Sequence, residues 1–166
     1  MLRIAGKVTS SIVDGPGFRF TVFFQGCPHK CDGCHNPQTW DMAGGKETEV
    51  SSIVEDIEAA YFVDGVTISG GEPFAQAKEL VHLLKELKAR DYHIIAYTGY
   101  TYEQILEDKE KADCLPYIDV LIDGRYEKDK RCLSMRFRGS SNQRVIDVPK
   151  TLESNEITLI DWDSEE

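Results

Sequence analysis

The chain has 166 residues, with 19 Lys and Arg against 29 Asp and Glu, so its formal net charge is −10. This length and a hydrophobic content of 41% fit one folded domain over 1–166 and argue against a disordered chain. The acidic balance argues against nucleic-acid binding, and no apolar run is long enough to cross a bilayer. Because the N-terminus also lacks an apolar signal core, we expect a cytoplasmic protein without membrane partners.

The first elements in chain order are two strands joined by a turn. Leu2 to Val8 is predicted to form a short strand, and Asp14 to Gly17 a turn in which Pro16 presets its own φ. Phe18 to Phe24 is aromatic and β-branched, which predicts a buried strand. The cysteine segment that begins at Cys27 is therefore expected in a loop at the carboxyl end of that strand.

Helices and strands are predicted to alternate in the middle of the chain. Apolar residues at three- and four-residue spacing predict one helix over Val50 to Tyr61 and another around Leu80 to Leu87. Further elements are expected as strands at 65–69, 93–97 and 118–122 and a short helix at 102–109. The last third, from Arg136, holds only short apolar runs, so we expect it to be irregular or antiparallel at the sheet edge, with a frayed tail over 161–166.

This alternation predicts an α/β fold built from parallel strand–helix–strand units. A closed eight-stranded α/β barrel takes about 250 residues, so we expect an incomplete barrel that is open on one side. Polar or glycine-rich loops follow four of the predicted strands. Because the carboxyl ends of parallel strands meet at one edge, these loops are expected to converge on one site: the cysteine segment, Gly70-Gly71-Glu72, Thr98-Gly99 and Asp123-Gly124-Arg125.

Three of the five cysteines, Cys27, Cys31 and Cys34, lie within eight residues as C-x3-C-x2-C. An odd cysteine count without an export signal disfavours a disulfide framework. Crowded thiols in a reducing compartment indicate a soft metal or a cluster. Cys114 and Cys132 have no close partner in sequence and are interpreted as ordinary, partly buried thiols.

Four interpretations of the cysteine segment remain open on the residues alone. A structural zinc site would need His29 or His35 as its fourth ligand. Cys31-x-x-Cys34-His35 also fits c-type haem attachment, and Cys31 with Cys34 fits a dithiol redox pair, but both leave Cys27 unused. The fourth interpretation is a 4Fe-4S cluster held by three thiolates. An electron-transfer cluster uses four cysteines, so an open iron would indicate chemistry at the cluster.

The cysteine triplet and Gly70-Gly71-Glu72 together resemble the radical S-adenosylmethionine superfamily. Asp14 to Gly17, Phe24 to Cys27 and the segment from Trp40 to Glu47 are similar to the activases of glycyl radical enzymes. Other motifs resemble the branch that activates the anaerobic ribonucleoside-triphosphate reductase: Thr98-Gly99-Tyr100, Asp119 to Tyr126 and Arg138 to Gln143. The resemblance covers about 4–148, with a core over 4–126 and a family-specific segment over 127–160.

The resemblance implies a set of site residues. The metal ligands would be Cys27, Cys31 and Cys34, and the residues near the cofactor would be Gly33, Cys34, His35, Gly70, Gly71, Glu72, Thr98, Asp123 and Arg125. Glycine backbone would approach the methionine end of the cofactor, and backbone groups or Glu72 would receive its ammonium. Each motif also has a plainer interpretation. Gly70 to Pro73 fits a strand-to-helix turn, Thr98 a turn hydroxyl, and Asp123 with Arg125 a solvated pair.

The resemblance also implies a reaction and its partners. An electron donor such as flavodoxin or ferredoxin would reduce the 4Fe-4S cluster. S-adenosylmethionine would then be cleaved to methionine and a 5′-deoxyadenosyl radical, which takes a hydrogen from a backbone glycine of the reductase large subunit. No catalytic residue beyond the cluster and cofactor is needed. Two alternatives are activation of another glycyl radical enzyme, such as pyruvate formate-lyase, and a non-enzymatic zinc-binding module.

Overall fold

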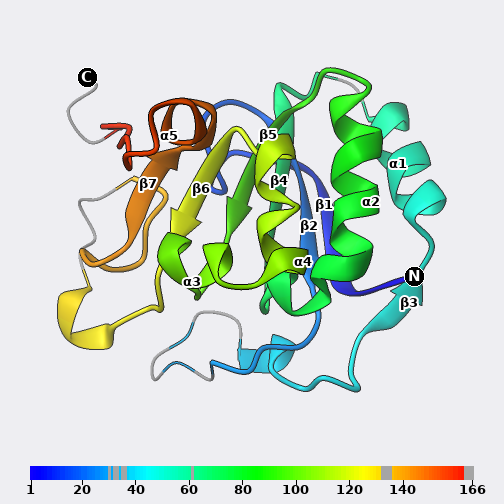
Figure 1. The fold of residues 1–166 in the computed structure, drawn as a ribbon. Coiled ribbons are helices and arrows are strands. Elements are labelled where there is room, and N and C mark those ends of the chain that lie inside the picture. The colour runs from blue at the N-terminus through cyan, green and yellow to red at the C-terminus, as the bar shows by residue number, and fades with distance from the viewer. Residues whose placement is uncertain (30, 32–33, 35–36, 61, 132–135, 163–166) are drawn as a thin grey trace.

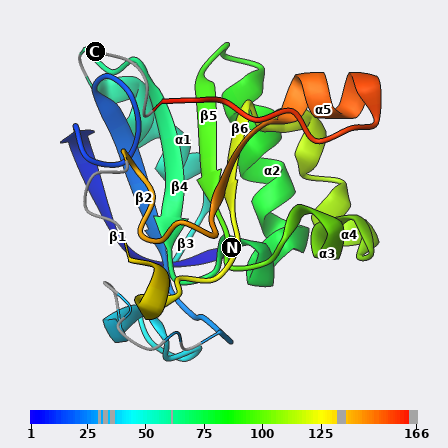
Figure 2. The same cartoon turned by 90° about the vertical axis from the view of Figure 1, so that its left-hand side faces the viewer.

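The computed structural model describes residues 1–29, 31, 34, 37–60, 62–131 and 136–162. They form a seven-stranded sheet in the order β3-β1-β2-β4-β5-β6-β7, and helices α1 to α5 lie against one of its faces (Figures 1 and 2). The strands are β1 (Leu2–Ser11), β2 (Arg19–Phe24), β3 (Lys46–Thr48), β4 (Gly65–Gly70), β5 (His93–Tyr97), β6 (Val120–Asp123) and β7 (Arg144–Asp147). The helices are α1 (Val50–Ala59), α2 (Ala77–Lys88), α3 (Tyr102–Leu106), α4 (Lys109–Ala112) and α5 (Val148–Ser154).

The centre of the sheet is parallel, as the alternation of strands and helices predicts. β2, β4, β5 and β6 pair in parallel, each with its neighbour. β1 pairs antiparallel with β2, because only a short connection without a helix joins them. The expected antiparallel edge of the last third is confirmed by β7 on β6. The α/β class is thus confirmed, whereas β3 and α5, both short, were not expected.

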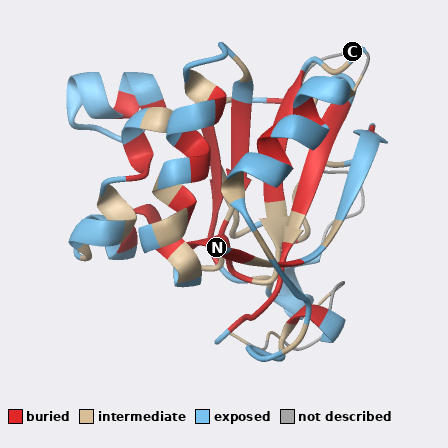
Figure 3. Ribbon diagram, turned by 90° about the vertical axis from the view of Figure 1, so that its right-hand side faces the viewer, coloured by how far each residue is buried: buried red, intermediate tan, exposed pale blue. Residues whose placement is uncertain are grey.

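Both predicted amphipathic helices are confirmed, and they bury their apolar faces against the sheet (Figure 3). The helix expected over 102–109 is instead the pair α3 and α4. Its interruption has a local cause, since the Asp108 side chain accepts hydrogen bonds from the backbone N–H groups of Glu110 and Lys111 and so begins a new helix. Within the described ranges, we find no helix with the length and apolar character that crossing a bilayer requires.

The two faces of the sheet differ in chemistry because side chains alternate along each strand. Val22, Ile68 and Ala96 face the helices and belong to the main core. Their strand neighbours Thr67 and Tyr97 belong to the opposite face. A second, smaller apolar cluster covers part of that face, over β5, β6 and β7, and consists of Ile95, Val120, Ile122, Val145 and Trp162. The remainder of the second face, over β2 and β4, is mostly polar and includes the buried residues Arg19, Thr21 and Thr67.

Cys114 is an ordinary buried thiol, as the sequence indicates. Its side chain is fully buried, and Sγ lies 3.7 Å from the carbonyl oxygens of Ala77 and Glu110. Burial raises the pKa of this thiol from 9.0 to about 12 because the thiolate is poorly solvated there. Cys132 lies outside the described residues.

We expect this buried thiol to make the fold sensitive to alkali. The folded state holds the proton more tightly than the unfolded state. The associated stability is therefore complete below pH 9.0 and is lost as pH rises toward about 12. In Cys114→Ala, the free energy of unfolding from urea titrations should fall less steeply between pH 9 and 11 than in the wild type. Equal slopes for the two proteins would show that Cys114 does not titrate with unfolding.

Candidate metal and cofactor site

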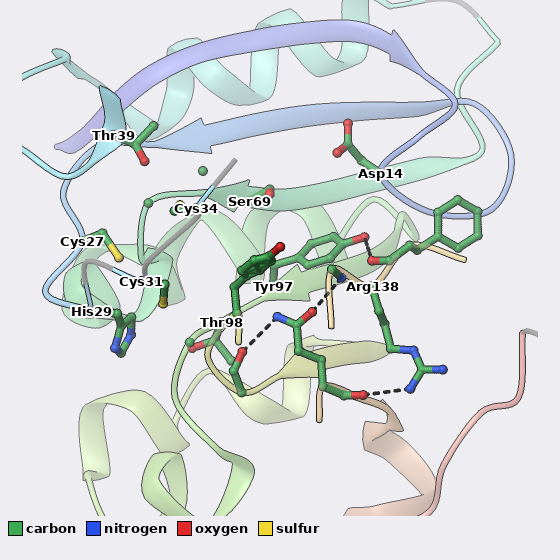
Figure 4. Close-up of a pocket in the computed structure, with 18 of the residues that line it drawn as sticks. Asp14, Cys27, His29, Cys31, Cys34, Thr39, Ser69, Tyr97, Thr98 and Arg138 are labelled. Carbon is green, nitrogen blue, oxygen red and sulfur yellow. Dashed lines mark hydrogen bonds between the residues drawn. The ribbon is translucent and has the colours of Figure 1, made fainter. Parts of the chain in front are cut away.

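A cavity of about 500 Å³ lies on the polar face of the sheet, away from the helices (Figure 4). The cysteines gather at one end of it, and Asp14 and Arg138 lie at the other. The structure brings six of the predicted site residues into its lining: Cys27, Cys31, Cys34, Gly70, Gly71 and Thr98. Gly33 and His35 lie outside the described residues.

Backbone hydrogen bonds fix the start of the cysteine segment. The Gly26 N–H donates to the Thr39 carbonyl at 2.6 Å, and the Cys27 N–H donates to the Trp40 carbonyl at 3.2 Å. The Gly26 carbonyl accepts from the Glu72 N–H at 2.8 Å. The segment is therefore held between the chain that follows the cysteines and the loop that follows β4, so that the Cys27 thiol has a defined place in the cavity.

The donor set of the cavity fits a thiolate-bound iron cluster. Three thiols line one cavity, and thiolates prefer soft metals and clusters. Burial raises the pKa of the Cys31 thiol, while the backbone of Tyr126 and the charge of Arg125 act to lower it. A 4Fe-4S cluster offers each thiolate its own iron, which matches three thiols in one cavity lining.

The cavity wall also contains a buried polar atom suited to a ligand. His29 lines the cavity, its side chain is 4% exposed, and its Nδ1 has no hydrogen-bond partner within the part of the chain that the structure describes. Buried polar atoms are normally hydrogen-bonded. An occupant of the cavity would supply the missing partner.

Gly70 and Gly71 are required by the chain's own backbone. Gly70 has φ +101°, and a Cβ there would lie 2.3 Å from the Phe24 nitrogen. A Cβ on Gly71 would lie 2.5 Å from the Gly26 carbonyl oxygen. Both glycines line the cavity, yet their lack of a side chain is explained by close packing against the end of β2 and the start of the cysteine segment.

Gly71→Ala should therefore destabilise the fold itself. The added methyl group meets backbone that cannot move aside, which costs about 2–3 kcal/mol of unfolding free energy. Gly6→Ala is the matched control, because a Cβ there would meet nothing within 4 Å. Urea titration of the apoproteins measures both. A Gly71→Ala variant as stable as Gly6→Ala would contradict the close approach.

Glu72 is a fully buried acceptor at the centre of a hydrogen-bond network and is not in the cavity lining. Its carboxylate accepts from Thr98 Oγ1 at 2.9 Å, the Gly99 N–H at 2.6 Å and the Phe74 N–H at 3.0 Å. His29 Nε2 lies 2.8 Å from Oε1. The structure thus gives the Glu72 side chain four partners of its own.

Asp123 and Arg125 line a neighbouring hollow, which shares Gly99 and Gly124 with the cavity. Asp123 is buried, accepts a hydrogen bond from the Tyr102 N–H in the first turn of α3 at 2.8 Å, and pairs with Arg144. Its contacts shape the loop after β6. The structure does not bring either side chain into the cavity.

Several residues of the cavity lining were not singled out as site residues: Asp14, Ser69, Tyr97, Arg138 and Gln143. Strand alternation could have identified Ser69 and Tyr97, since both lie on the face opposite the core. The Tyr97 hydroxyl donates to the Phe137 carbonyl at 2.7 Å, and burial together with Asp14 raises its pKa. The others come from loops, whose packing the periodicity does not predict.

The polar segment 138–143 forms a wall of this cavity. Gln143 Oε1 accepts from the Gly139 N–H at 2.8 Å, and its Nε2 donates to the Gly124 carbonyl at 3.0 Å. Arg138 Nη1 donates to the Gln143 carbonyl at 2.8 Å. The segment is thus held to the loop after β6 by amide hydrogen bonds, which explains why it is polar throughout.

Comparison with known proteins agrees with an iron–sulfur site. A family model described as a 4Fe-4S single cluster domain matches residues 13–146. An anaerobic ribonucleoside-triphosphate reductase-activating protein of Pasteurella multocida is 37% identical, over 82% of this chain and 91% of its own length. The protein of that name from Enterobacteria phage T4 is 36% identical, over 80% of this chain and 86% of its own.

Two further similar proteins differ more in length or in structure. A pyruvate formate-lyase-activating enzyme of Clostridium pasteurianum is 43% identical, over 64% of this chain and 49% of its own length. The crystal structure of QueE from Escherichia coli aligns with a TM-score of 0.48 and 21% identity, over 60% of this chain and 53% of that one.

Proposed function

This chain belongs to the family of anaerobic ribonucleoside-triphosphate reductase-activating proteins, and from this premise we propose that Cys27, Cys31 and Cys34 hold its 4Fe-4S cluster. The observation that carries the proposal is the presence of all three thiols in the lining of one cavity. The chain is an activating enzyme that generates a glycyl radical with S-adenosylmethionine. The bound cluster and cofactor supply the one-electron chemistry that opens a carbon–sulfur bond.

The residues of this chain bind and orient these groups. Each thiol must give up its proton when it becomes a ligand. The cavity, at about 500 Å³, has the size of a small-molecule site. We propose that the backbone of Gly70 and Gly71 lies along the methionine end of the cofactor. Thr98 then borders it, with its hydroxyl oriented by Glu72.

Asp123 and Arg125 act more indirectly in this proposal. Asp123 orders the loop after β6 through its hydrogen bond from the first turn of α3 and its pair with Arg144. Burial raises the pKa of the Cys31 thiol, and the positive charge of Arg125 offsets a part of that rise. Both would support the cofactor by shaping the wall behind it.

We also propose that the sheet is the incomplete barrel of the radical S-adenosylmethionine type. Two observations support this: helices α1 to α5 lie on one face, and the cavity lies on the other. An open side would admit a protein loop, which a closed barrel would exclude.

The substrate we propose is the glycine-bearing loop of the reductase large subunit, with flavodoxin or ferredoxin as electron donor. A cytoplasmic location fits the thiols, since the four described cysteines form no disulfide.

The second candidate partner is pyruvate formate-lyase, favoured by the 43% identity of its activating enzyme. That similarity spans 116 residues and about half of the enzyme. The reductase-activating proteins instead match over 80–82% of this chain and 86–91% of their own lengths. We therefore propose the reductase, rather than pyruvate formate-lyase, as the partner of this chain.

Anaerobic reconstitution with iron and sulfide tests the cluster assignment. We expect about four irons and four sulfides per chain, with an absorption spectrum that bleaches in air because one iron lacks a protein ligand. A stoichiometric, air-stable zinc ion at the three cysteines would contradict the proposal and support a structural zinc module.

A further inference from the structure

We propose that His29 is a positioning residue that holds the cysteine segment against the ends of β4 and β5 through its hydrogen bond to Glu72. The inference rests on the proposed function in one respect, that Cys27 and Cys31 are cluster ligands. It assigns a positioning role to a histidine that the sequence offered only as a candidate zinc ligand.

The hydrogen bond between His29 and Glu72 is short and buried, and its donor and acceptor can be assigned. His29 stands two residues from both Cys27 and Cys31, and its Nε2 lies 2.8 Å from Glu72 Oε1, with side chains 4% and 0% exposed. The other partners of this carboxylate are the backbone N–H groups of Gly99 and Phe74 and the hydroxyl of Thr98. All of these donate, so the carboxylate acts as acceptor throughout and Nε2 carries the hydrogen of the shared bond.

The loop after β5 is shaped around the His29 ring. A Cβ on Gly99 would lie 2.4 Å from His29 Cδ2, so no other residue fits there without displacing the imidazole. The Tyr100 ring meets the imidazole edge-on, with centroids 4.6 Å apart and planes at 75°. Thr98 contributes the hydroxyl that orients Glu72. The motif Thr98-Gly99-Tyr100 therefore contributes a hydroxyl that binds Glu72, a position without a side chain and an aromatic ring that packs on His29.

The hydrogen bond of His29 gives the cysteine segment an attachment that needs no metal, in addition to the backbone bonds at its start, such as that from Cys27 to Trp40. His29 lies in the middle of the stretch between Cys27 and Cys31. Ligands held in place before the metal arrives bind it more tightly, since less chain must be ordered on binding. His29 thus affects iron binding indirectly, by positioning the cysteines on either side of it.

Two substitutions separate the hydrogen bond from the volume of the ring. His29→Phe keeps an aromatic ring without a donor, whereas His29→Gln places an amide N–H near the position of Nε2. The measurement is the anaerobic rate of iron release to a chelator from the reconstituted proteins. We expect about tenfold faster release from His29→Phe and near wild-type release from His29→Gln. His82→Phe, on the exposed side of α2, is the matched control and should release iron at the wild-type rate.

A double-mutant cycle with Glu72→Met, which keeps the length of the side chain but removes its oxygen acceptors, tests the pairing itself. If His29 acts through Glu72, the effect of His29→Phe on iron release should largely disappear in the Glu72→Met background. His29→Leu is the second variant without a donor, should His29→Phe yield no folded protein. The inference would be overturned if His29→Phe released iron at the wild-type rate or if His29→Gln released it as fast as His29→Phe. Independent effects of the two substitutions in the cycle would also overturn it. Failure of the wild type to bind iron would overturn the proposed function instead.

Discussion

Cys34→Ser is expected to lose the cluster, cofactor cleavage and partner activation together. Loss of one of three thiolates leaves two protein ligands, too few to retain a cubane whose fourth iron stays open. Serine matches cysteine in size, but its hydroxyl is a hard and weakly acidic ligand, so packing at position 34 is kept while the metal chemistry is lost. We expect iron near zero after desalting and no detectable 5′-deoxyadenosine from S-adenosylmethionine with a strong reductant.

Cys132→Ser is the control for this experiment. Cys132 is far in sequence from the cysteine segment, and we expect its variant to keep wild-type iron and wild-type formation of 5′-deoxyadenosine. Cofactor cleavage by Cys34→Ser at the wild-type rate, or loss of iron from Cys132→Ser, would show that the three-cysteine assignment is wrong.

Glu72→Ala should have the largest effect on stability. The substitution removes a fully buried carboxylate and leaves its donors, on His29, Phe74, Thr98 and Gly99, without an acceptor. Unpaired buried donors cost about 1–3 kcal/mol each, so we expect a total loss of about 3–5 kcal/mol. The apoprotein should therefore unfold at much lower urea, before any metal is added.

Glu79→Ala is the matched comparison on the exposed first turn of α2. That carboxylate is 43% exposed and pairs with the N-terminal amine, so its loss should change the free energy of unfolding by less than about 1 kcal/mol. If Glu72→Ala were as stable as Glu79→Ala, the carboxylate would be free to serve the cofactor as the sequence motif predicts.

The fold could be predicted where hydrophobic periodicity is strong. α1 and α2 each bury a continuous apolar face, and the central strands carry enough β-branched residues to be identified. Two errors have local causes. α3 and α4 are separated by the Asp108 cap, and β3 has three residues, too few to show a period.

The site could be predicted as far as the motifs extend. The cysteine spacing and the glycines after β4 point to residues that do share one cavity. The contacts that Glu72 and Asp123 make within their own chain could not be predicted, because they depend on neighbours far away in sequence. The contacts of His29 and Gln143 could not be predicted for the same reason. Their partners, Glu72 and Gly124, lie 43 and 19 residues away.

The most direct test of the account is whether the reduced, reconstituted protein places a radical on its partner. The chain, S-adenosylmethionine and an anaerobic ribonucleoside-triphosphate reductase large subunit are mixed under strict anaerobiosis and examined by electron paramagnetic resonance. We predict a glycyl radical signal on the reductase, with 5′-deoxyadenosine formed in equal amount, and no signal on pyruvate formate-lyase under the same conditions. An iron-loaded protein that cleaves the cofactor yet leaves the reductase without a radical, or that activates pyruvate formate-lyase instead, would contradict it.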